Sequence, residues 1–214
     1  MNLEILNPHV MKIVISARDK DSIRSIAKRI GLSYGWTYYW TQQLISSGLF
    51  KRKNNRIFLD KTNRLYKELI GFVKRNFKND ISFRYYALGL FGIKYSFTKT
   101  DAVFIWTKGG YNISRYKEFY PIFIKVRKID LELFASYCKK LGFKINSNRH
   151  VFFSVDILED FKVYNLNGMP VDSLEETIKF MKDNIYNFEP ALEMIQEMYN
   201  KKLKIRYKEI KTNV

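Results

Sequence analysis

The stretch SIRSIAKRIGLSYGWTYYWTQQLISSGLF, residues 22–50, decides the fold of the N-terminal part of this 214-residue chain. Apolar residues recur at helical spacing over Ile23–Ile30, and Gly31 is placed to end that helix. Ser33 is a natural N-cap for a further helix, which Gly48 ends. The sequence therefore predicts two helices joined by a tight turn, followed by an extended segment.

The flanking segments predict one more helix and a hairpin. Residues 8–18 have the apolar spacing of a helix, with a proline in its first turn. Residues 49–50 begin one short strand and residues 57–59 form the next. Between them lies a basic loop, Lys51–Arg56, whose Asn54-Asn55 pair suits a left-handed turn. The predicted order is helix, helix, helix, hairpin.

Three pieces of this region, Ile26–Ser33, Thr37–Leu44 and Ser47–Phe50, resemble the winged helix-turn-helix core of many bacterial and archaeal regulators. The resemblance covers about the first 60 residues. It implies that the third helix enters the major groove of DNA and that the hairpin, or wing, contacts the backbone or the minor groove. The residues that it places inward on the third helix are Thr37, Trp40, Thr41 and Leu44.

The candidate DNA contacts come from the second helix, from the third helix with its cap, and from the wing. Tyrosine hydroxyls and glutamine amides can bond phosphates and base edges, and glutamine suits adenine. The third helix has no Lys or Arg, so positive contacts are expected from the other two places. Core or dimer packing is the alternative for the aromatic residues, and a solvated basic turn is the alternative for the wing. The candidates are Lys28, Arg29, Ser33, Tyr34, Trp36, Tyr38, Tyr39, Gln42, Gln43, Lys51, Arg52, Lys53 and Arg56.

The charge of the chain also favours a nucleic-acid partner. The 38 Lys and Arg residues outnumber the 21 Asp and Glu residues, for a formal net charge of +17. Such a field attracts phosphate and speeds encounter. Residues 151–200 carry 3 basic and 10 acidic side chains, whereas residues 1–64 carry 12 and 4. We therefore expect DNA to meet the first 150 residues and to avoid 151–200.

The rest of the chain predicts an α+β fold with three parts. These are a winged helix-turn-helix domain at 1–62, a linking helix at 63–80 and an α+β effector or dimerisation domain at 81–214. Further helices are predicted at 82–91, 130–141, 173–184 and 189–202, the last entered through Pro190. Strands are predicted at 102–107, 120–126, 151–157 and 161–166, with the last two as a pair.

The second half carries a resemblance of its own. Ala87–Gly92, Asn167–Val171 and Ser173–Ile178 resemble the AbiEi-type antitoxins, which join an N-terminal winged helix to a C-terminal α+β domain. The resemblance implies a transcriptional autorepressor and a partner nucleotidyltransferase toxin. The acidic stretch 151–200 could face that partner or the other subunit, or be a solvated helix face.

An enzyme finds little support in the sequence. It has no Gly-rich phosphate loop and no Ser-centred elbow, and two histidines with one cysteine cannot supply the usual zinc set. We predict no catalytic residue, metal site or cofactor. The alternative is a metal-dependent nuclease built on Asp160-Phe-Lys162, in which the carboxylate of Asp160, with Asp156 nearby and Glu118 or Asp101 to complete the set, holds Mg²⁺ and Lys162 helps the attacking water.

These observations predict a sequence-selective double-stranded DNA-binding transcription regulator that is homodimeric. The lone Cys138, the lack of a signal-peptide pattern and the absence of a membrane-length apolar run lead us to expect a cytoplasmic protein without a membrane partner. A winged helix that binds RNA or another protein remains the further alternative.

Overall fold

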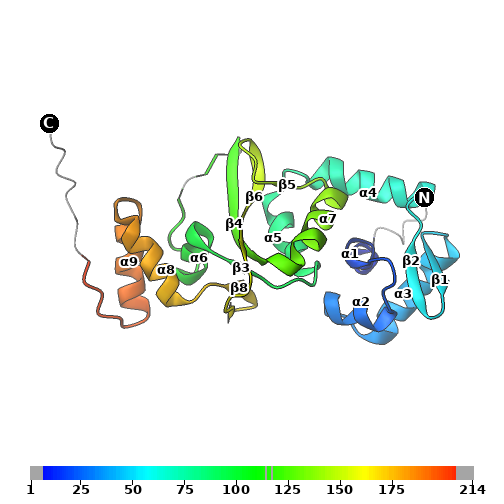
Figure 1. Ribbon diagram of the computed structural model, residues 1–214, viewed down its shortest axis with the longest axis horizontal. Coiled ribbons are helices and arrows are strands. Elements are labelled where there is room, and N and C mark those ends of the chain that lie inside the picture. Colours follow the sequence, from blue (N-terminus) through cyan, green and yellow to red (C-terminus); the bar gives the residue numbers. More distant parts are fainter. Residues whose placement is uncertain (1–6, 114, 117, 206–214) are drawn as a thin grey trace. The chain divides into compact units, whose positions relative to one another are not determined.

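A computed structural model describes residues 7–113, 115–116 and 118–205 of the chain (Figure 1). It contains both helices and strands, largely in separate runs, so the protein belongs to the predicted α+β class. The chain divides into two compact units: unit 1 holds the residues up to 93 together with 133–143, and unit 2 holds 94–132 and the residues from 144 on. Each predicted part, 1–62, 63–80 and 81–214, is one continuous range. Unit 1 is discontinuous, because it combines the residues up to 93 with 133–143. None of the helices among these residues has the length and apolar character needed to span a bilayer.

Unit 1 begins with the three helices and the hairpin that the sequence predicts. The hairpin is followed by two more helices, and a helix from later in the chain joins the unit from Leu133 on. The elements are α1 (Pro8–Ser16), α2 (Ile23–Ile30), α3 (Tyr34–Ser46), β1 (Phe50–Lys53), β2 (Arg56–Leu59), α4 (Arg64–Phe77), α5 (Ile81–Gly89) and α7 (Leu131–Leu141).

Local signals explain the ends of these elements. Ser22 and Ser33 cap α2 and α3 through their side chains, and Gly31 ends α2 with a left-handed φ of 66°. Asn54 and Asn55 take φ values of 49° and 58°, as the sequence predicted, so they alone make the turn between β1 and β2. The predicted basic loop is therefore wrong in extent, because its lysines and arginines lie in the two strands.

The carboxylate of Asp21 ties the start of unit 1 together. It accepts two hydrogen bonds from the Arg29 guanidinium, at 2.7 and 2.9 Å, and one from the backbone N–H of Arg18 at 2.9 Å. Arg29 also donates to the carbonyl of Ser16 at 2.8 Å, so a single guanidinium joins α1, the turn and α2. The backbone of Asp21 in turn accepts from the N–H of Ile57 at 2.8 Å, which attaches β2 to the same turn.

Helix α7 closes the C-terminal end of α1. The Lys140 ammonium donates to the carbonyl oxygens of Val14 at 2.6 Å, Ile15 at 2.9 Å and Ala17 at 3.3 Å. These oxygens belong to the end of a helix, where carbonyls lack partners and a positive charge is favourable. Burial, and next the Lys61 ammonium, lowers the pKa of Lys140 to about 7. The same contact thus holds the end of α1 in place and buries the Lys140 ammonium.

Unit 2 is built on a six-stranded mixed sheet of order β5-β6-β4-β3-β8-β7. Strands β4, β5 and β6 run parallel to one another, β3 is antiparallel to β4 and parallel to β8, and β7 is antiparallel to β8. The strands are β3 (Tyr95–Phe97), β4 (Phe119–Arg127), β5 (Lys144–Ile145), β6 (His150–Leu158), β7 (Tyr164–Leu166) and β8 (Met169–Val171), and the helices are α6 (Lys99–Trp106), α8 (Leu174–Asp183) and α9 (Ile185–Met198).

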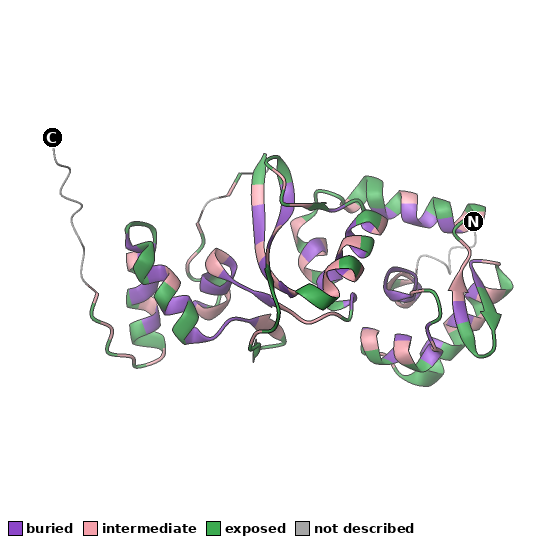
Figure 2. Ribbon diagram, viewed as in Figure 1, coloured by how far each residue is buried: buried purple, intermediate pink, exposed green. Residues whose placement is uncertain are grey.

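The predicted strand 102–107 is wrong, because these residues lie in α6 and the turn that follows. A short apolar run fits a buried strand and a buried helix equally well. Val103 belongs to a buried cluster that it shares with α8 and α9, including Ile178 and Leu192, so packing against helices decides its conformation. The buried residues of α6, α8 and α9 appear in purple in Figure 2.

Two further predictions of unit 2 need correction. Of the predicted strand 161–166 only Tyr164–Leu166 forms a strand, β7, and it does not pair with 151–157. It pairs instead with β8 across a tight turn at Asn167 and Gly168, whose φ values are 52° and 84°. The last helix begins at Ile185, so Pro190 lies inside it and not in its first turn. The capping box of Ser173 and Glu176 at the start of α8 is confirmed.

We expect the buried Asp21–Arg29 pair, whose two side chains are each 9% exposed, to be a large part of the stability of unit 1. Asp21→Asn should lower the free energy of unfolding by about 3 kcal/mol, because Arg29 keeps a buried charge without its carboxylate. Asp21→Asn/Arg29→Met should recover part of that loss. Urea unfolding at pH 7 measures both. A control, Glu68→Gln, removes the exposed pair with Arg64 and should cost far less, and an equal cost for Asp21→Asn would contradict this account.

Lys140 gives a prediction for alkaline pH. Its pKa is about 7 in the folded protein, against an ordinary value of 10.5, so between pH 7 and 9 the unfolded chain binds more protons. The free energy of unfolding should therefore rise with pH, by at most about 1.4 kcal/mol per pH unit. Near pH 9 the opposite effect of Cys138 begins, because burial raises the pKa of its thiol from 9.0 to about 12. At higher pH buried tyrosines such as Tyr66, whose pKa is raised to about 12, add to that opposite effect.

Urea unfolding at pH 7, 8 and 9 tests this for the wild type and for Lys140→Met, with the exposed Lys67→Met as the control. Lys140→Met should lose most of the rise, and Lys67→Met should keep it. The same slope in all three proteins would rule out Lys140 as its source.

Candidate nucleic-acid interface

Helix α3 has one side in the core of unit 1. Thr37, Thr41 and Leu44 are buried, as the sequence predicted, and Trp40 is partly buried. Thr37 donates its hydroxyl to the carbonyl of Ser33 at 2.9 Å, which secures the first turn of the helix. Residues at spacings of three and four share a face of a helix, so these positions fix which side α3 presents outward.

The outward side of α3 is aromatic and amide-rich. Trp36 is 59% exposed, Tyr34 and Tyr39 are each 52% exposed and Tyr38 is 40% exposed, whereas large apolar rings are ordinarily covered. The rings support one another: Tyr34 and Tyr38 lie 5.9 Å apart, and Trp36 stacks at 6.1 Å on His9 of α1. Gln43 is exposed and Gln42 is partly buried. This face therefore offers stacking surfaces, hydroxyls and an amide to a partner.

The hairpin carries three of its four cations on one face. Side chains alternate along a strand, and residues opposite each other in an antiparallel pair share a face. Phe50 and Ile57 are buried, so their face of the hairpin is the inner one. The register of Lys51 with Phe58 and of Lys53 with Arg56 puts the other face outward, with three basic side chains. Arg52 is on the inner face near the turn, exposed, and donates to Asn55 at 2.6 Å.

A shallow basic groove lies on that outer face. Lys53 and Arg56 are directly opposite each other, an arrangement that is unfavourable for two like charges unless an anion joins them. Phe58 forms the floor with them, and Lys20 lines the same groove from the turn between α1 and α2. Lys20 is not among the candidates predicted from the sequence, because its place in the turn after the first helix gives no local sign that it lies beside the hairpin. The backbone bond from the Lys20 N–H to the carbonyl of Ile57, at 2.8 Å, brings it there.

Two of the predicted contacts lie on α2 and one caps α3. Lys28 is exposed and available to a partner. Arg29 is held by Asp21 and Ser16 and its side chain is only 9% exposed, so we leave it out of the candidate interface. The hydroxyl of Ser33 accepts from the N–H of Trp36 at 3.3 Å, which positions the start of α3.

Every carboxylate between residues 7 and 62 is already paired. Asp19 binds Lys61 at 3.0 Å, Asp21 binds Arg29 and Asp60 binds Lys51 at 2.8 Å. Hydrogen bonds from Lys51 and Thr62 hold the pKa of Asp60 well below its ordinary value, so it stays charged and offsets Lys51. Within 7–62, the cationic side chains that form no ion pair with a described residue are Lys12, Arg18, Lys20, Arg24, Lys28, Arg52, Lys53 and Arg56.

Three of the four carboxylates of the alternative nuclease site are engaged elsewhere, and the fourth, Glu118, is exposed. Asp160 pairs with Lys94 at 2.6 Å and Asp156 pairs with Lys99 at 2.8 Å. Asp101 is 2% exposed, pairs with Arg115 at 3.1 Å and accepts the N–H of Phe123 at 2.7 Å. Across the described ranges, no three His, Cys, Asp or Glu side chains meet as a metal site would require. This arrangement gives the nuclease alternative no assembled centre.

Comparison with known proteins adds no relative: no family model, no curated protein and no solved structure matches this chain. The residues of unit 1 themselves must therefore indicate the function.

Proposed function

We propose that the protein binds double-stranded DNA through α3 and the β1–β2 hairpin, as a winged helix-turn-helix regulator of transcription. The observation that carries the proposal is the distribution of charge in unit 1. Its first 62 residues use all their described carboxylates in ion pairs, and leave Lys20, Lys53 and Arg56 together on the outer face of the hairpin. Such a cluster, whose neighbouring carboxylates are already paired with other cations, suits the phosphates of a polyanion.

The two surfaces would divide the work of binding. Cations on the hairpin would neutralise phosphates and set the position of the protein on the duplex, without reading sequence. Helix α3 would lie in the major groove, where the amide of Gln43 can bond adenine and the rings of Trp36 and Tyr39 can contact thymine methyl groups and sugars. Because α3 has no Lys or Arg, guanine readout would be weak and sequence discrimination modest.

The wider role of this binding is part of the same proposal. Two copies binding inverted half-sites would double the contact area and give a dimeric repressor. The resemblance of the second half to AbiEi-type antitoxins extends the proposal to an autorepressor with a nucleotidyltransferase partner, for which a toxin gene next to this one would be the simplest support.

The hairpin cations give the first test. Lys20→Gln/Lys53→Gln/Arg56→Gln should weaken binding to a duplex at least tenfold, and should reduce the slope of log affinity against log salt by about 2 to 3, because each lost phosphate contact removes about 0.9. Fluorescence anisotropy with a labelled duplex, at salt concentrations from about 50 to 200 mM, measures both quantities.

Its matched control is Lys67→Gln/Arg75→Gln/Lys78→Gln, which removes three exposed charges on and just after α4. The control should stay close to the wild type in affinity and slope. Equal losses in the two triple variants would mean that only total charge matters and would defeat the proposed interface. Tighter binding to duplex RNA than to duplex DNA of the same sequence would favour the RNA-binding alternative instead.

The outward face of α3 gives the second test. Trp36→Ala/Tyr39→Ala/Gln43→Ala changes three exposed positions, so the fold should survive with an unaltered circular-dichroism spectrum. We expect about tenfold weaker binding to a duplex selected from a random pool, little change for a scrambled duplex and an unchanged salt slope, since no charge is lost. Tyr86→Ala, an exposed ring on α5, is the control. A triple variant that still prefers the selected duplex as strongly as the wild type would exclude α3 as the reading element.

A further inference from the structure

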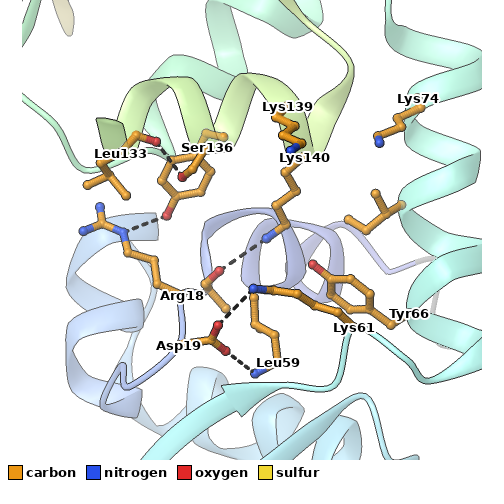
Figure 3. A pocket seen from close by; sticks show the side chains of 13 residues that line it. Arg18, Asp19, Leu59, Lys61, Tyr66, Lys74, Leu133, Ser136, Lys139 and Lys140 are labelled. Carbon is orange, nitrogen blue, oxygen red and sulfur yellow. Dashed lines mark hydrogen bonds and ion pairs between the residues drawn. The ribbon is translucent and has the colours of Figure 1, made fainter. Parts of the chain in front are cut away.

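Unit 1 contains a pocket of about 560 Å³ that the proposed DNA interface does not use (Figure 3). Its walls come from the turn after α1, the end of β2, helix α4 and helix α7, and all of its lining residues belong to unit 1. The volume falls within the range of about 300 to 1,000 Å³ that small-molecule sites occupy.

The pocket is strongly basic. Five cationic side chains line it, against the single carboxylate of Asp19. That carboxylate is already occupied, because it accepts from the N–H of Leu59 at 2.8 Å and pairs with Lys61 at 3.0 Å. Figure 3 shows Lys61 directed toward Asp19 and Lys140 directed toward the end of α1. The cationic residues are Arg18, Lys61, Lys74, Lys139 and Lys140.

Two of these cations form neither an ion pair nor a hydrogen bond through their side chains with any other residue that the structure describes. These are Lys74 of α4 and Lys139 of α7, which are exposed at the pocket. They are therefore free to bind an anion at the mouth of the pocket without losing an existing contact.

The inner wall is apolar. Leu59, Ile70 and Leu133 line it, together with the ring of Tyr66, which is 6% exposed. A bare inorganic ion would leave this surface in contact with water, whereas a ligand with an apolar body would cover it at a gain of about 25 cal/mol per Å². Charge and shape together select an amphipathic anion over a simple one.

The surroundings of the Lys140 ammonium also favour a negatively charged ligand. The ammonium meets Lys61 as well as the α1 carbonyls, and its pKa of about 7 reflects burial first and that repulsion second. A negative charge in the pocket would offset both effects.

We propose that the pocket between α1, α4 and α7 binds a small organic anion, with its phosphate or carboxylate group at Lys74 and Lys139 and its apolar body against Leu59, Ile70 and Leu133. The inference does not depend on DNA binding, because it rests on a different surface of unit 1 and is tested without DNA.

Isothermal titration calorimetry of the full chain with four probes tests the proposal. Phenyl phosphate and benzoate carry the two acidic groups on one apolar ring, inorganic phosphate lacks the ring, and benzyl alcohol lacks the charge. At least one of the ring-bearing anions should bind saturably, at least tenfold more tightly than inorganic phosphate or benzyl alcohol. Phenyl phosphate and benzoate then show which acidic group the site prefers. The proposal would be overturned if inorganic phosphate bound as tightly as phenyl phosphate and benzoate. It would also be overturned if neither phenyl phosphate nor benzoate bound saturably below about 10 mM, a concentration that corresponds to a binding free energy of only about 3 kcal/mol.

Variants locate the binding in the pocket. Lys74→Gln/Lys139→Gln should weaken the preferred anion at least tenfold, whereas Lys67→Gln/Lys78→Gln, which removes two charges outside the pocket, should leave it unchanged. Ser136→Phe places a ring into the pocket from an exposed position on α7 and should abolish binding while the thermal midpoint stays near that of the wild type. Equal effects of the two double variants, or full binding by Ser136→Phe, would show that the anion binds elsewhere.

Discussion

The buried ion pair of Asp21 and Arg29 is the constraint on which unit 1 depends. The two side chains, of opposite charge, are each largely shielded from water, and either charge would destabilise the fold if the other were removed. Because Arg29 also donates to the carbonyl of Ser16, the pair sets the angle between α1 and α2. The backbone carbonyl of Asp21 accepts from the N–H of Ile57, which attaches the hairpin to the same turn. The positions of α3 and of the outer hairpin face follow from that arrangement.

The same pairing explains how a moderately basic segment acquires a strongly basic surface. Each of the three described carboxylates forms an ion pair with one cation: Asp19 with Lys61, Asp21 with Arg29 and Asp60 with Lys51. The other cations of residues 7–62 therefore have no described carboxylate to balance them. The sharp turn at Asn54 and Asn55 then puts Lys53 and Arg56 directly opposite each other, where their like charges repel. This repulsion lowers the stability of the hairpin.

Much of this arrangement could be predicted from the sequence, because it is local. Caps, glycines and apolar spacing fix the helices through α3, and the two asparagines fix the turn. What could not be predicted depends on contacts between distant residues. The sequence shows that Arg29 is basic but not that Asp21 buries it, and it shows an apolar run at 102–107 but not the helices against which α6 packs. Lys20 was missed for the same reason, since only the bond to Ile57 brings it to the hairpin.

Helix α7 has a consequence for how this protein could be divided or inherited in pieces. It follows β4 and precedes β5 in the sequence, yet from Leu133 on it belongs to unit 1, where Lys140 covers the carbonyl oxygens at the end of α1. A fragment that stops at residue 93 would leave those oxygens to solvent, and an intact unit 1 needs the chain to pass through unit 2 and return. The two units therefore cannot be exchanged by a single cut and rejoining of the gene, so recombination would tend to transmit them together.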